Sequence, residues 1–421
     1  MNPHRVSAPT LEPSNPRTLE PSPLTPRTLS VVIPAFNEEQ GILPIVRRVL
    51  SLRPQLAAAG LDGPEVIVVD DGSRDRTAEL VGGVPEVRMI RHGVNRGYGA
   101  ALKSGMTAAR GDLIAFLDAD GTYPPESFPA LCQAALAGAD IVVGSRMANE
   151  ASAMPLSRRV GNRIFAGLIT LLGNRRINDS ASGMRVIRRE ALRHLDPLPD
   201  GLHFTPIMSL RAMHEGLTVV EVPIPYAERV GRSKLSVVRD GLRYVHSIVW
   251  TALSYNPVRV LGGLGLAGVL LASLVGIGLA VARLSGVTTL GPWGVAAVFT
   301  ALVAGVGGVS LFGLGATFNY LLALLRREPI RYGLFGTPLF ARPLERHFGW
   351  LGLLAGMAGG VLALGSLVLG LYGWPIDRLW LYLVGSALLI LVGVQLMVSW
   401  ILMETLQEVA QRNATKEDVQ R

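Results

Sequence analysis

The stretch Leu113–Asp120, "LIAFLDAD", joins five consecutive apolar residues to two carboxylates that stand one residue apart. A short apolar run closed by turn residues is typical of a buried strand, and Gly121 follows at once. Alternate residues of an extended chain point to the same side, so Asp118 and Asp120 can converge on one cation. The stretch therefore predicts a strand that ends in a metal site, although two such aspartates taken alone are also common in plain acidic turns.

Further β-branched runs alternate with helical patterns on both sides of this stretch. The expected strands are Ser30–Ile33, Val66–Val69, Val87–Ile90, Leu113–Leu117, Ile141–Val143 and Val219–Val222, and the expected helices are 38–52, 98–109, 125–137 and 158–172. This alternation predicts an α/β domain with a mostly parallel sheet. Ligands of such sheets bind beyond the carboxyl ends of the strands, where the polar motifs of this sequence lie.

Three polar motifs follow the first three strands: "VVIPAFNEE" (31–39), "VIVVDDGSRDRT" (66–77) and "NRGYGAALKSG" (95–105). Asp70 and Asp71 can accept hydrogen bonds from a ribose or a base, or they can form an ordinary Asp-Gly turn. Gly97 and Gly99 open a helix whose amides, with Lys103 one turn on, suit a phosphate, although an ordinary helix start has the same pattern. With these motifs beside it, the Asp118–Asp120 pair favours Mg²⁺ or Mn²⁺, bound together with substrate phosphates.

The second half of the chain has a different composition. Of the 421 residues, 49% are apolar and 17% are charged, whereas a soluble protein carries about 25% charged residues. Four uncharged apolar stretches follow residue 257: Val260–Ala282, about Val295–Leu325, Trp350–Pro375 and Leu379–Met403. Each exceeds the roughly 20 residues that a helix needs to cross a bilayer. The sequence therefore predicts an all-α transmembrane domain over residues 258–404.

Charges predict how these spans are oriented. The connection 326–349 carries five arginines, whereas the other two connections have only Arg283 and Arg378 at their edges. The basic connection should be cytoplasmic, and an even number of spans then places 1–257 and the tail 405–421 in the cytoplasm as well. The single cysteine, Cys132, allows no internal disulfide and fits a reducing compartment.

Two segments flank the α/β domain, which is expected over 29–232. Residues 1–28 are rich in proline, serine and threonine and are expected to form a disordered tail. In 233–257, apolar residues recur at three- and four-residue spacing among basic ones, which predicts an amphipathic helix on the membrane surface or, alternatively, an ordinary packing helix. The net charge of +8 suits nucleic acid, an anionic membrane or a phosphorylated substrate.

An ordered set of motifs makes the interpretation specific. The motifs are "VIPAFNEE", "VVDDGSRDRT", "NRGYGAALKSG", "FLDADGTYPPE", "VVGSRM", "NDSASGMRVIRRE" and "RVGRSKLS". Together they resemble a family 2 glycosyltransferase, above all the polyprenyl-phosphate enzymes such as dolichyl-phosphate mannose or glucose synthases. The resemblance covers about 29–250, and the four-span region is similar to membrane-anchored members. It implies a GT-A fold, a nucleotide-sugar donor, a polyprenyl phosphate acceptor and no nucleic acid partner.

The resemblance also implies residue roles. Pro34, Phe36, Glu38 and Asp71 would bind the nucleotide, and Ala119 and Asp120, with Asp118, would meet the diphosphate and the metal. The residues implied on the acceptor side are Arg146, either Arg158 or Arg159, the mobile-loop residues Arg229, Ser233 and Lys234, and Ser182 in the "SGMR" motif. Two positions depart from mannose synthases. Thr122 stands where a metal-binding Gln is common, and its hydroxyl is expected to be a weaker metal ligand, with water completing the shell. The Arg229–Lys234 motif is one residue shorter, which leaves the choice of mannose open.

The region 200–215 is expected to hold a base if the acceptor is a hydroxyl group. No carboxylate occurs between Asp200 and Glu215. A phosphate monoester is mostly ionised at pH 7 and attacks without a base, so the missing carboxylate fits a phosphate acceptor. Together with the resemblance, it leads to the expectation of inverting transfer of one hexose, from a donor of the GDP-mannose or UDP-glucose type, to a polyprenyl phosphate at the cytoplasmic face.

Two alternative functions and the oligomeric state stay open at this point. One is transfer to a lipid hydroxyl, as in ceramide or diacylglycerol, with His203 as the base. Another is a membrane scaffold with a catalytically dead domain. The small residues of Val260–Ala282 and Gly305–Gly315 also permit a homo-oligomer, although lipid-facing helices explain them equally well.

Overall fold

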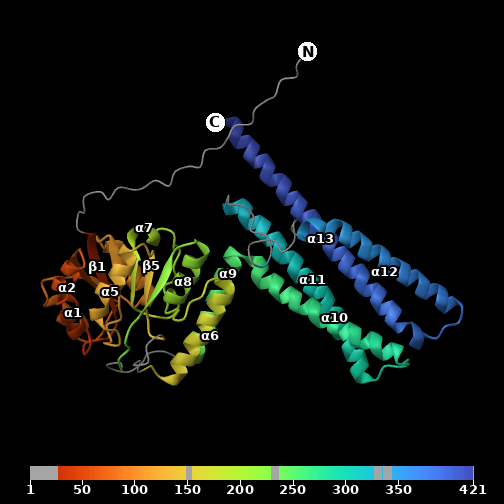
Figure 1. Cartoon of the computed structure of the whole chain (residues 1–421), viewed down its shortest axis with the longest axis horizontal. Coiled ribbons are helices and arrows are strands. Elements are labelled where there is room, and N and C mark those ends of the chain that lie inside the picture. The colour runs from red at the N-terminus through yellow and green to blue at the C-terminus, as the bar shows by residue number, and fades with distance from the viewer. Residues whose placement is uncertain (1–26, 148–153, 229–236, 327–333, 335–343, 421) are drawn as a thin grey trace, which may run out of the picture.

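The computed structural model describes residues 27–147, 154–228, 237–326, 334 and 344–420. These residues form an α/β domain followed by four long apolar helices, which confirms the expected fold class (Figure 1). The expected tail 1–28 falls almost wholly outside the described residues.

The α/β domain is built on one mixed sheet. Within the described residues its order is β3–β2–β1–β4–β6–β5–β7. The strands are β1 (Arg27–Ala35), β2 (Leu61–Asp70), β3 (Val87–Arg91), β4 (Leu113–Phe116), β5 (Ile141–Ser145), β6 (Arg185–Arg188) and β7 (Val219–Pro223). Only β6 runs antiparallel to its neighbours β4 and β5. This strand was not expected from the sequence, because its two apolar residues are too few to show a period.

Helices cover both faces of this sheet. Val31 and Ile33 of β1 point into one core and Val32 points into the other, as the alternation of a strand requires. The first core is covered by α1 (Ile42–Leu50), α2 (Arg53–Ala58), α3 (Thr77–Gly82) and α5 (Phe128–Leu136), which follows the short turn η1 (Pro125–Ser127). The second core is covered by α4 (Tyr98–Ala108), α6 (Leu156–Gly173), α8 (Phe204–His214) and α9 (Val237–Tyr255), and α7 (Arg189–Leu192) follows β6.

Helix α8 has no counterpart among the expected helices. Nine of its residues are buried, including Thr205 and Ser209, so it has no polar face that a period could reveal. The expected amphipathic segment 233–257 contains α9, which begins at Val237 and ends at Tyr255.

The membrane half contains four helical spans among the described residues: Val258–Leu284, Pro292–Arg326, Leu344–Leu371 and Arg378–Val409. They consist of η2 (Val258–Gly262) with α10 (Gly263–Leu284), α11 (Pro292–Arg326), η3 (Leu344–His347) with α12 (Phe348–Leu371), and α13 (Ile376–Gln420). The mean hydropathy of their most apolar stretches is 2.0–2.4, and at most 17% of each such stretch is buried within the protein. Such helices are long and apolar enough to face lipid. α13 continues past residue 404, where the last span was expected to end, and extends away from the other helices (Figure 1).

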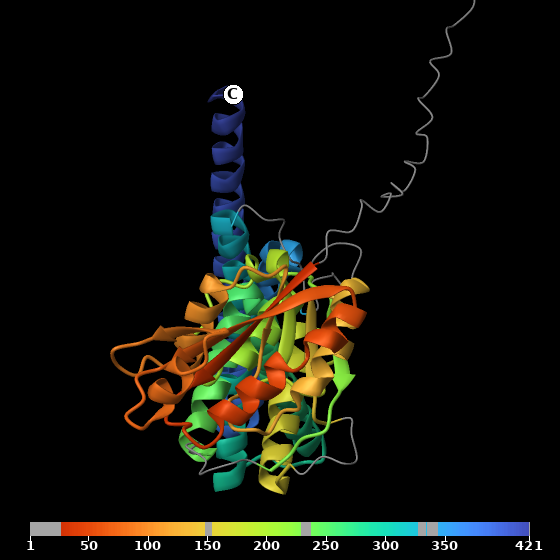
Figure 2. The ribbon, with the colours of Figure 1, turned by 90° about the vertical axis from the view of Figure 1, so that its left-hand side faces the viewer.

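The sheet domain is tied to one end of this helical bundle, which lies behind it in Figure 2. The guanidinium of Arg259 donates to the Leu172 carbonyl at 3.1 Å and to Asn174 Oδ1 at 3.0 Å. Arg211 donates to the Tyr255 hydroxyl at 3.3 Å, and the guanidinium of Arg326 lies 4.4 Å from the Tyr255 ring centre. These contacts hold α6, α8 and α9 at the end of the bundle where the first span begins.

Candidate active site

The two aspartates after β4 are held by hydroxyl groups. The Tyr98 hydroxyl donates to Asp118 Oδ1 at 2.8 Å, and Thr122 donates to Asp120 Oδ1 through its amide at 3.1 Å and its hydroxyl at 2.6 Å. Burial, followed by the nearby charge of Asp118, raises the pKa of Tyr98 well above its ordinary value, so this phenol is a neutral donor. Gly183 leaves room here, because a Cβ on it would lie 2.5 Å from Asp118 Oδ2.

The chemistry of this donor set fits a hard divalent cation. Asp118 and Asp120 offer carboxylate oxygens, which Mg²⁺ and Mn²⁺ prefer. In the described part of the chain, no group of three or more His, Cys, Asp or Glu side chains is arranged so that it could hold a metal ion by itself. A bound cation would therefore need phosphate oxygens and water as its further ligands. The Thr122 hydroxyl donates its proton to Asp120 and so orients that carboxylate, whether or not its oxygen also contacts a metal.

A pocket of about 610 Å³ lies at the C-terminal ends of β1, β2 and β3. It is lined by Phe36, Asn37, Gly72, Ser73, Arg74, Arg91, His92, Gly93, Val94 and Asn95. Two of its loops are joined by side chains: the Asn37 amide donates to Ser73 Oγ at 2.9 Å, and Asn37 Oδ1 accepts from the Arg74 amide at 2.8 Å. Gly72 has a φ of 75°, and a Cβ on it would lie 2.7 Å from the Val94 backbone. Only glycine therefore fits where the loop after β2 meets the loop after β3.

The loop after β1 links this pocket to the segment that carries the aspartates. A Cβ on Gly41 would lie 2.4 Å from the Ala119 carbonyl oxygen, so the start of α1 rests on the Ala119–Asp120 backbone. The expected nucleotide ligands Pro34, Phe36 and Glu38 lie at the end of β1 and in the loop that leads to this contact, where Phe36 and Glu38 are half-buried.

Asp70 and Asp71, which were expected to bind the nucleotide, are buried and contact the protein's own loops. Asp71 Oδ1 lies 2.7 Å from His92 Nδ1, and its carboxylate accepts the amides of residues 96 and 97 at 2.8 and 2.9 Å. Asp70 is fully buried and accepts the Ser73 amide at 3.1 Å. Both carboxylates therefore hold the loops beside the pocket, and a direct contact of Asp71 with a nucleotide would require its bonds to rearrange.

The expected phosphate contacts at the start of α4 are also taken by the chain itself. The carbonyl oxygen of Asp200 accepts the amides of Gly99 and Ala100 at 2.7 and 3.2 Å. Lys103 Nζ lies 2.6 Å from Asp200 Oδ1 and donates to the Leu198 carbonyl at 3.0 Å. Lys103 thus ties α4 to the segment before α8, and it reaches a phosphate only if this ion pair opens.

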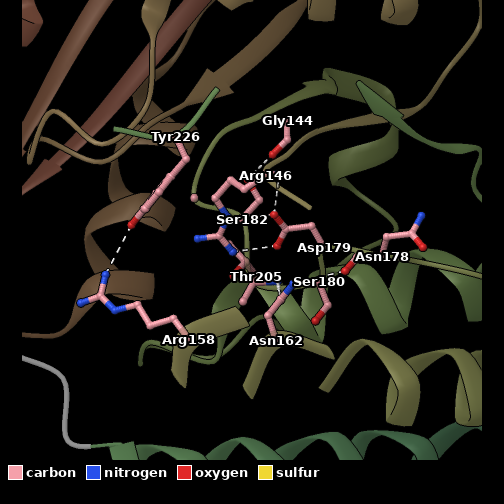
Figure 3. A network of polar contacts seen from close by, with 12 residues as sticks. Gly144, Arg146, Arg158, Asn162, Asn178, Asp179, Ser180, Ser182, Thr205 and Tyr226 are labelled. Carbon is pink, nitrogen blue, oxygen red and sulfur yellow. Dashed lines mark hydrogen bonds and ion pairs between the residues drawn. The ribbon is translucent and has the colours of Figure 1, made fainter. Parts of the chain in front are cut away.

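Arg146 lies in a buried network that Figure 3 shows from close by. Its Nε and Nη2 atoms donate to the two oxygens of Asp179 at 2.8 and 2.7 Å, and Nη1 donates to the Tyr123 hydroxyl at 2.9 Å. Asp179 is fully buried, and Arg146 is only 9% exposed. This bidentate ion pair with Asp179 occupies the edge of the guanidinium that would otherwise bind a phosphate. The sequence interpretation missed Asp179 as the partner, although the residue stands within the quoted motif "NDSASGMR".

The other expected acceptor contacts divide into three groups. Arg158 Nη1 donates to the Tyr226 hydroxyl at 3.3 Å across the network of Figure 3, and Arg159 is half-buried on the same helix. Ser182 is fully buried and donates to the Gly144 carbonyl at 2.6 Å, so it holds the fold together. The expected loop residues Arg229, Ser233 and Lys234 lie outside the described residues.

His203, the alternative base, stands immediately before α8. Its ring centre lies 6.3 Å from that of Tyr244 on α9. Burial, with smaller effects from the charges of Arg243 and His246, lowers the pKa of His203 below its ordinary value. The imidazole is therefore neutral at pH 7.

Comparisons with known proteins give the family of the chain. The model of the family "Glycosyl transferase family 2" matches residues 30–196, and that of a "Domain of unknown function (DUF8752)" matches 257–417. The chain is 32% identical to a dolichyl-phosphate hexose transferase of Haloferax volcanii over 53% of this chain and 94% of that protein. It is 33% identical to an undecaprenyl-phosphate 4-deoxy-4-formamido-L-arabinose transferase of Pseudomonas aeruginosa, over 70% of this chain and 84% of that one.

Among solved structures, the chain resembles glucosyl-3-phosphoglycerate synthase from Mycobacterium tuberculosis, in complex with Mn²⁺, uridine diphosphate and glucosyl-3-phosphoglycerate. The identity is 25% and the TM-score is 0.41, over 54% of this chain and 80% of that one. The sequence similarity to the two transferases is stronger than the similarity to this solved structure, so the family is assigned from the sequence. The chain belongs to glycosyl transferase family 2, and it is a glycosyltransferase with four apolar helices after its catalytic domain.

Proposed function

We propose that this enzyme transfers one hexose from a nucleotide sugar to a polyprenyl phosphate at the cytoplasmic face of a membrane. One observation carries the proposal: the loop after β1 lines a pocket of nucleotide size and then packs on Ala119 between the two aspartates, in a domain that is tied to a bundle of membrane helices. The names of the two relatives, which act on dolichyl and undecaprenyl phosphates, support the class of acceptor.

The donor would lie with its base in the pocket beside Phe36 and Asn37. Its diphosphate would lie against Asp118 and Asp120, because the loop that lines the pocket leads to Gly41, which packs on the Ala119 backbone. A Mg²⁺ or Mn²⁺ ion held by these aspartates would supply positive charge for the departing nucleoside diphosphate. Tyr98 and Thr122 keep the two carboxylates in place by donating hydrogen bonds to them. Such fixed donors need no rearrangement as charge develops during transfer.

The arrangement of carboxylates favours a phosphate acceptor over a hydroxyl. Asp179 lies near the site but is bound through both oxygens by Arg146. Glu221, the other carboxylate beside this network, accepts the amides of Asn178 and Asp179. A carboxylate that is fully engaged by a guanidinium or by amides is a poor base. An ionised phosphate oxygen attacks the anomeric carbon without proton transfer, so the site needs no base.

The membrane arrangement supports an acceptor at the level of the catalytic domain. The sheet domain is attached where the first span begins, at Arg259, and where the second span ends, at Arg326. The basic connection after Arg326 favours the cytoplasmic side for this end of the bundle. A polyprenyl phosphate in the bilayer would therefore present its headgroup at the level of the catalytic domain.

A product assay tests the proposal. Membranes that contain the full chain are incubated with a panel of labelled nucleotide sugars and with undecaprenyl or dolichyl phosphate, and the lipid product is identified by mass spectrometry. We expect a polyprenyl-phosphate sugar that is absent with the Asp120→Asn variant. Labelled hexosylceramide or hexosyldiacylglycerol in place of that product would overturn the proposal, and the absence of any metal-dependent donor binding would favour a scaffold.

A further inference from the structure

A second pocket, of about 580 Å³, lies at the edge of the sheet opposite to the nucleotide pocket. Its lining comes from α6, from the residue Met147 after β5, and from the segment 176–178 that follows α6. The nucleotide pocket lies at the β2–β3 edge, whereas this one lies at the β5–β7 edge. It includes neither Asp118 nor Asp120, so it is separate from the proposed catalytic centre.

The chain after α6 folds back along the helix and forms the wall of this pocket. The Ile177 amide donates to Thr170 Oγ1 at 3.2 Å, and the Asn162 side chain donates to the Asn178 carbonyl at 3.2 Å. The Asn178 side chain in turn donates to Glu221 Oε2 at 2.7 Å, which fixes the segment to β7. Ala166 and Ile177, each 4% exposed, supply an apolar floor.

Two arginines stand on this pocket. Arg163 on α6 and Arg176 after it are exposed, and their side chains make no hydrogen bond or ion pair with another described residue. The segment 155–178 contains five arginines and no acidic residue. Two guanidinium groups that have no carboxylate partner among the described residues, set around an apolar floor, suit a phosphate group that brings apolar atoms with it.

An apolar stripe runs along α6 beside the pocket. Leu156, Val160, Ile164 and Leu171 are 75%, 47%, 60% and 65% exposed, and their spacing places them on one side of the helix. Arg259 ties the last turn of α6 to the first span, and α6 and α9 lie on the side of the domain nearest to the bundle (Figure 1). A basic helix with such a stripe at this level suits the headgroup region of an anionic membrane.

We propose that this pocket binds the headgroup of an anionic phospholipid. Arg163 and Arg176 hold the phosphodiester, and an acyl chain follows the Ile164–Leu171 side of α6 into the bilayer. The lipid is neither donor nor acceptor, so the site is additional to the proposed reaction. A phospholipid fits better than free phosphate, because the apolar floor and the stripe continue from the two arginines.

Native mass spectrometry of the full chain, released from nanodiscs without nucleotide sugar, tests the site. Nanodiscs of phosphatidylcholine with a small fraction of phosphatidylglycerol provide the probe. The double variant Arg163→Gln with Arg176→Gln should bind phosphatidylglycerol at least about ten-fold more weakly than the parent, since it loses charge-assisted hydrogen bonds. Arg193→Gln, an exposed arginine after β6, is the matched control and should bind as the parent does.

Two further arms separate the possible sources of the phosphate. Replacing Ile164 and Leu171 with Gln should also weaken retention of phosphatidylglycerol, and inorganic phosphate at millimolar concentration should not displace the lipid. Equal retention by the parent and the double arginine variant would overturn the proposal. Equal binding of phosphatidylcholine, or displacement by inorganic phosphate, would do so as well.

Discussion

Arg259 at the start of the first span donates to the Leu172 carbonyl in the last turn of α6 at 3.1 Å. A cation at this end of a helix is stabilised by the helix dipole and satisfies a carbonyl that has no partner within the helix. The contact joins the catalytic domain to the membrane bundle through side-chain chemistry and not only through chain continuity.

Replacing Arg259 with Gln should loosen this junction. We expect amide hydrogen exchange in 156–178 to become faster, with transfer to a membrane-embedded acceptor reduced and binding of nucleotide sugar unchanged. Hydrogen–deuterium exchange and isothermal titration measure the two effects. Arg283→Gln, in the first span's last turn, is the control, and unchanged exchange in α6 would show that the junction is held by other contacts.

Thr122 should act through Asp120. Asp120→Asn should abolish metal-dependent turnover, because the carboxylate charge at the expected cation is lost. Thr122→Ala should cost much less and mainly raise the metal concentration needed for half-maximal rate, since the 2.6 Å bond to Asp120 is lost. Thr122→Ser keeps the hydroxyl and should restore the parent value. Steady-state rates over a Mn²⁺ series test this, and a Thr122→Ala variant as inactive as Asp120→Asn would contradict it.

Asp179 should contribute strongly to the stability of the fold, because it is the charged partner of the buried Arg146. Asp179→Asn leaves the Arg146 charge buried with a neutral partner, and breaking a buried pair of this kind costs about 3–5 kcal/mol. Chemical unfolding of the purified protein should show this loss, and Arg146→Gln combined with Asp179→Asn should recover part of it. Unchanged stability with a raised KM for the lipid phosphate would indicate instead that Arg146 is an acceptor ligand.

His203 gives a prediction for pH and for the alternative acceptor. Its pKa is lowered in the fold, so the unfolded state binds a proton first as pH falls through about 6.5. The stability that the neutral His203 contributes is therefore present above that pH and is lost below it. His203→Gln should flatten unfolding stability between pH 7.5 and 5.5, and its turnover should stay within a few-fold of the parent. A loss of several orders of magnitude would favour a hydroxyl acceptor.

The single cysteine offers a test of the first core. Cys132 on α5 is fully buried, and burial raises the pKa of its thiol to about 12. A thiol that stays protonated and inaccessible is unreactive. Thiol reagents at pH 8 should therefore label the native protein far more slowly than the protein in denaturant, as followed by mass spectrometry. Fast labelling of the native protein would contradict the burial of Cys132.

Sequence reasoning located the strand ends with the residues that give them chemistry. Asp118 and Asp120 follow β4, and Asp70 closes β2, because apolar runs bounded by turn residues mark both the strand and its end. It did not find β6 or α8, since β6 has too few apolar residues and α8 is buried on every side. Orientation of the spans and the loop 229–236 stay predictions.

What the sequence determined by itself was the order of elements and the class: polar motifs after β-strands, four apolar spans and an acidic pair at one strand end. Only the tertiary structure decided which charges meet. Asp179 is distant from Arg146 in sequence but takes both prongs of its guanidinium, and Asp200 takes Lys103 and the first amides of α4. Local patterns report hydrophobic periodicity and turn chemistry, whereas the partner of a charge depends on how distant segments pack, which periodicity does not encode.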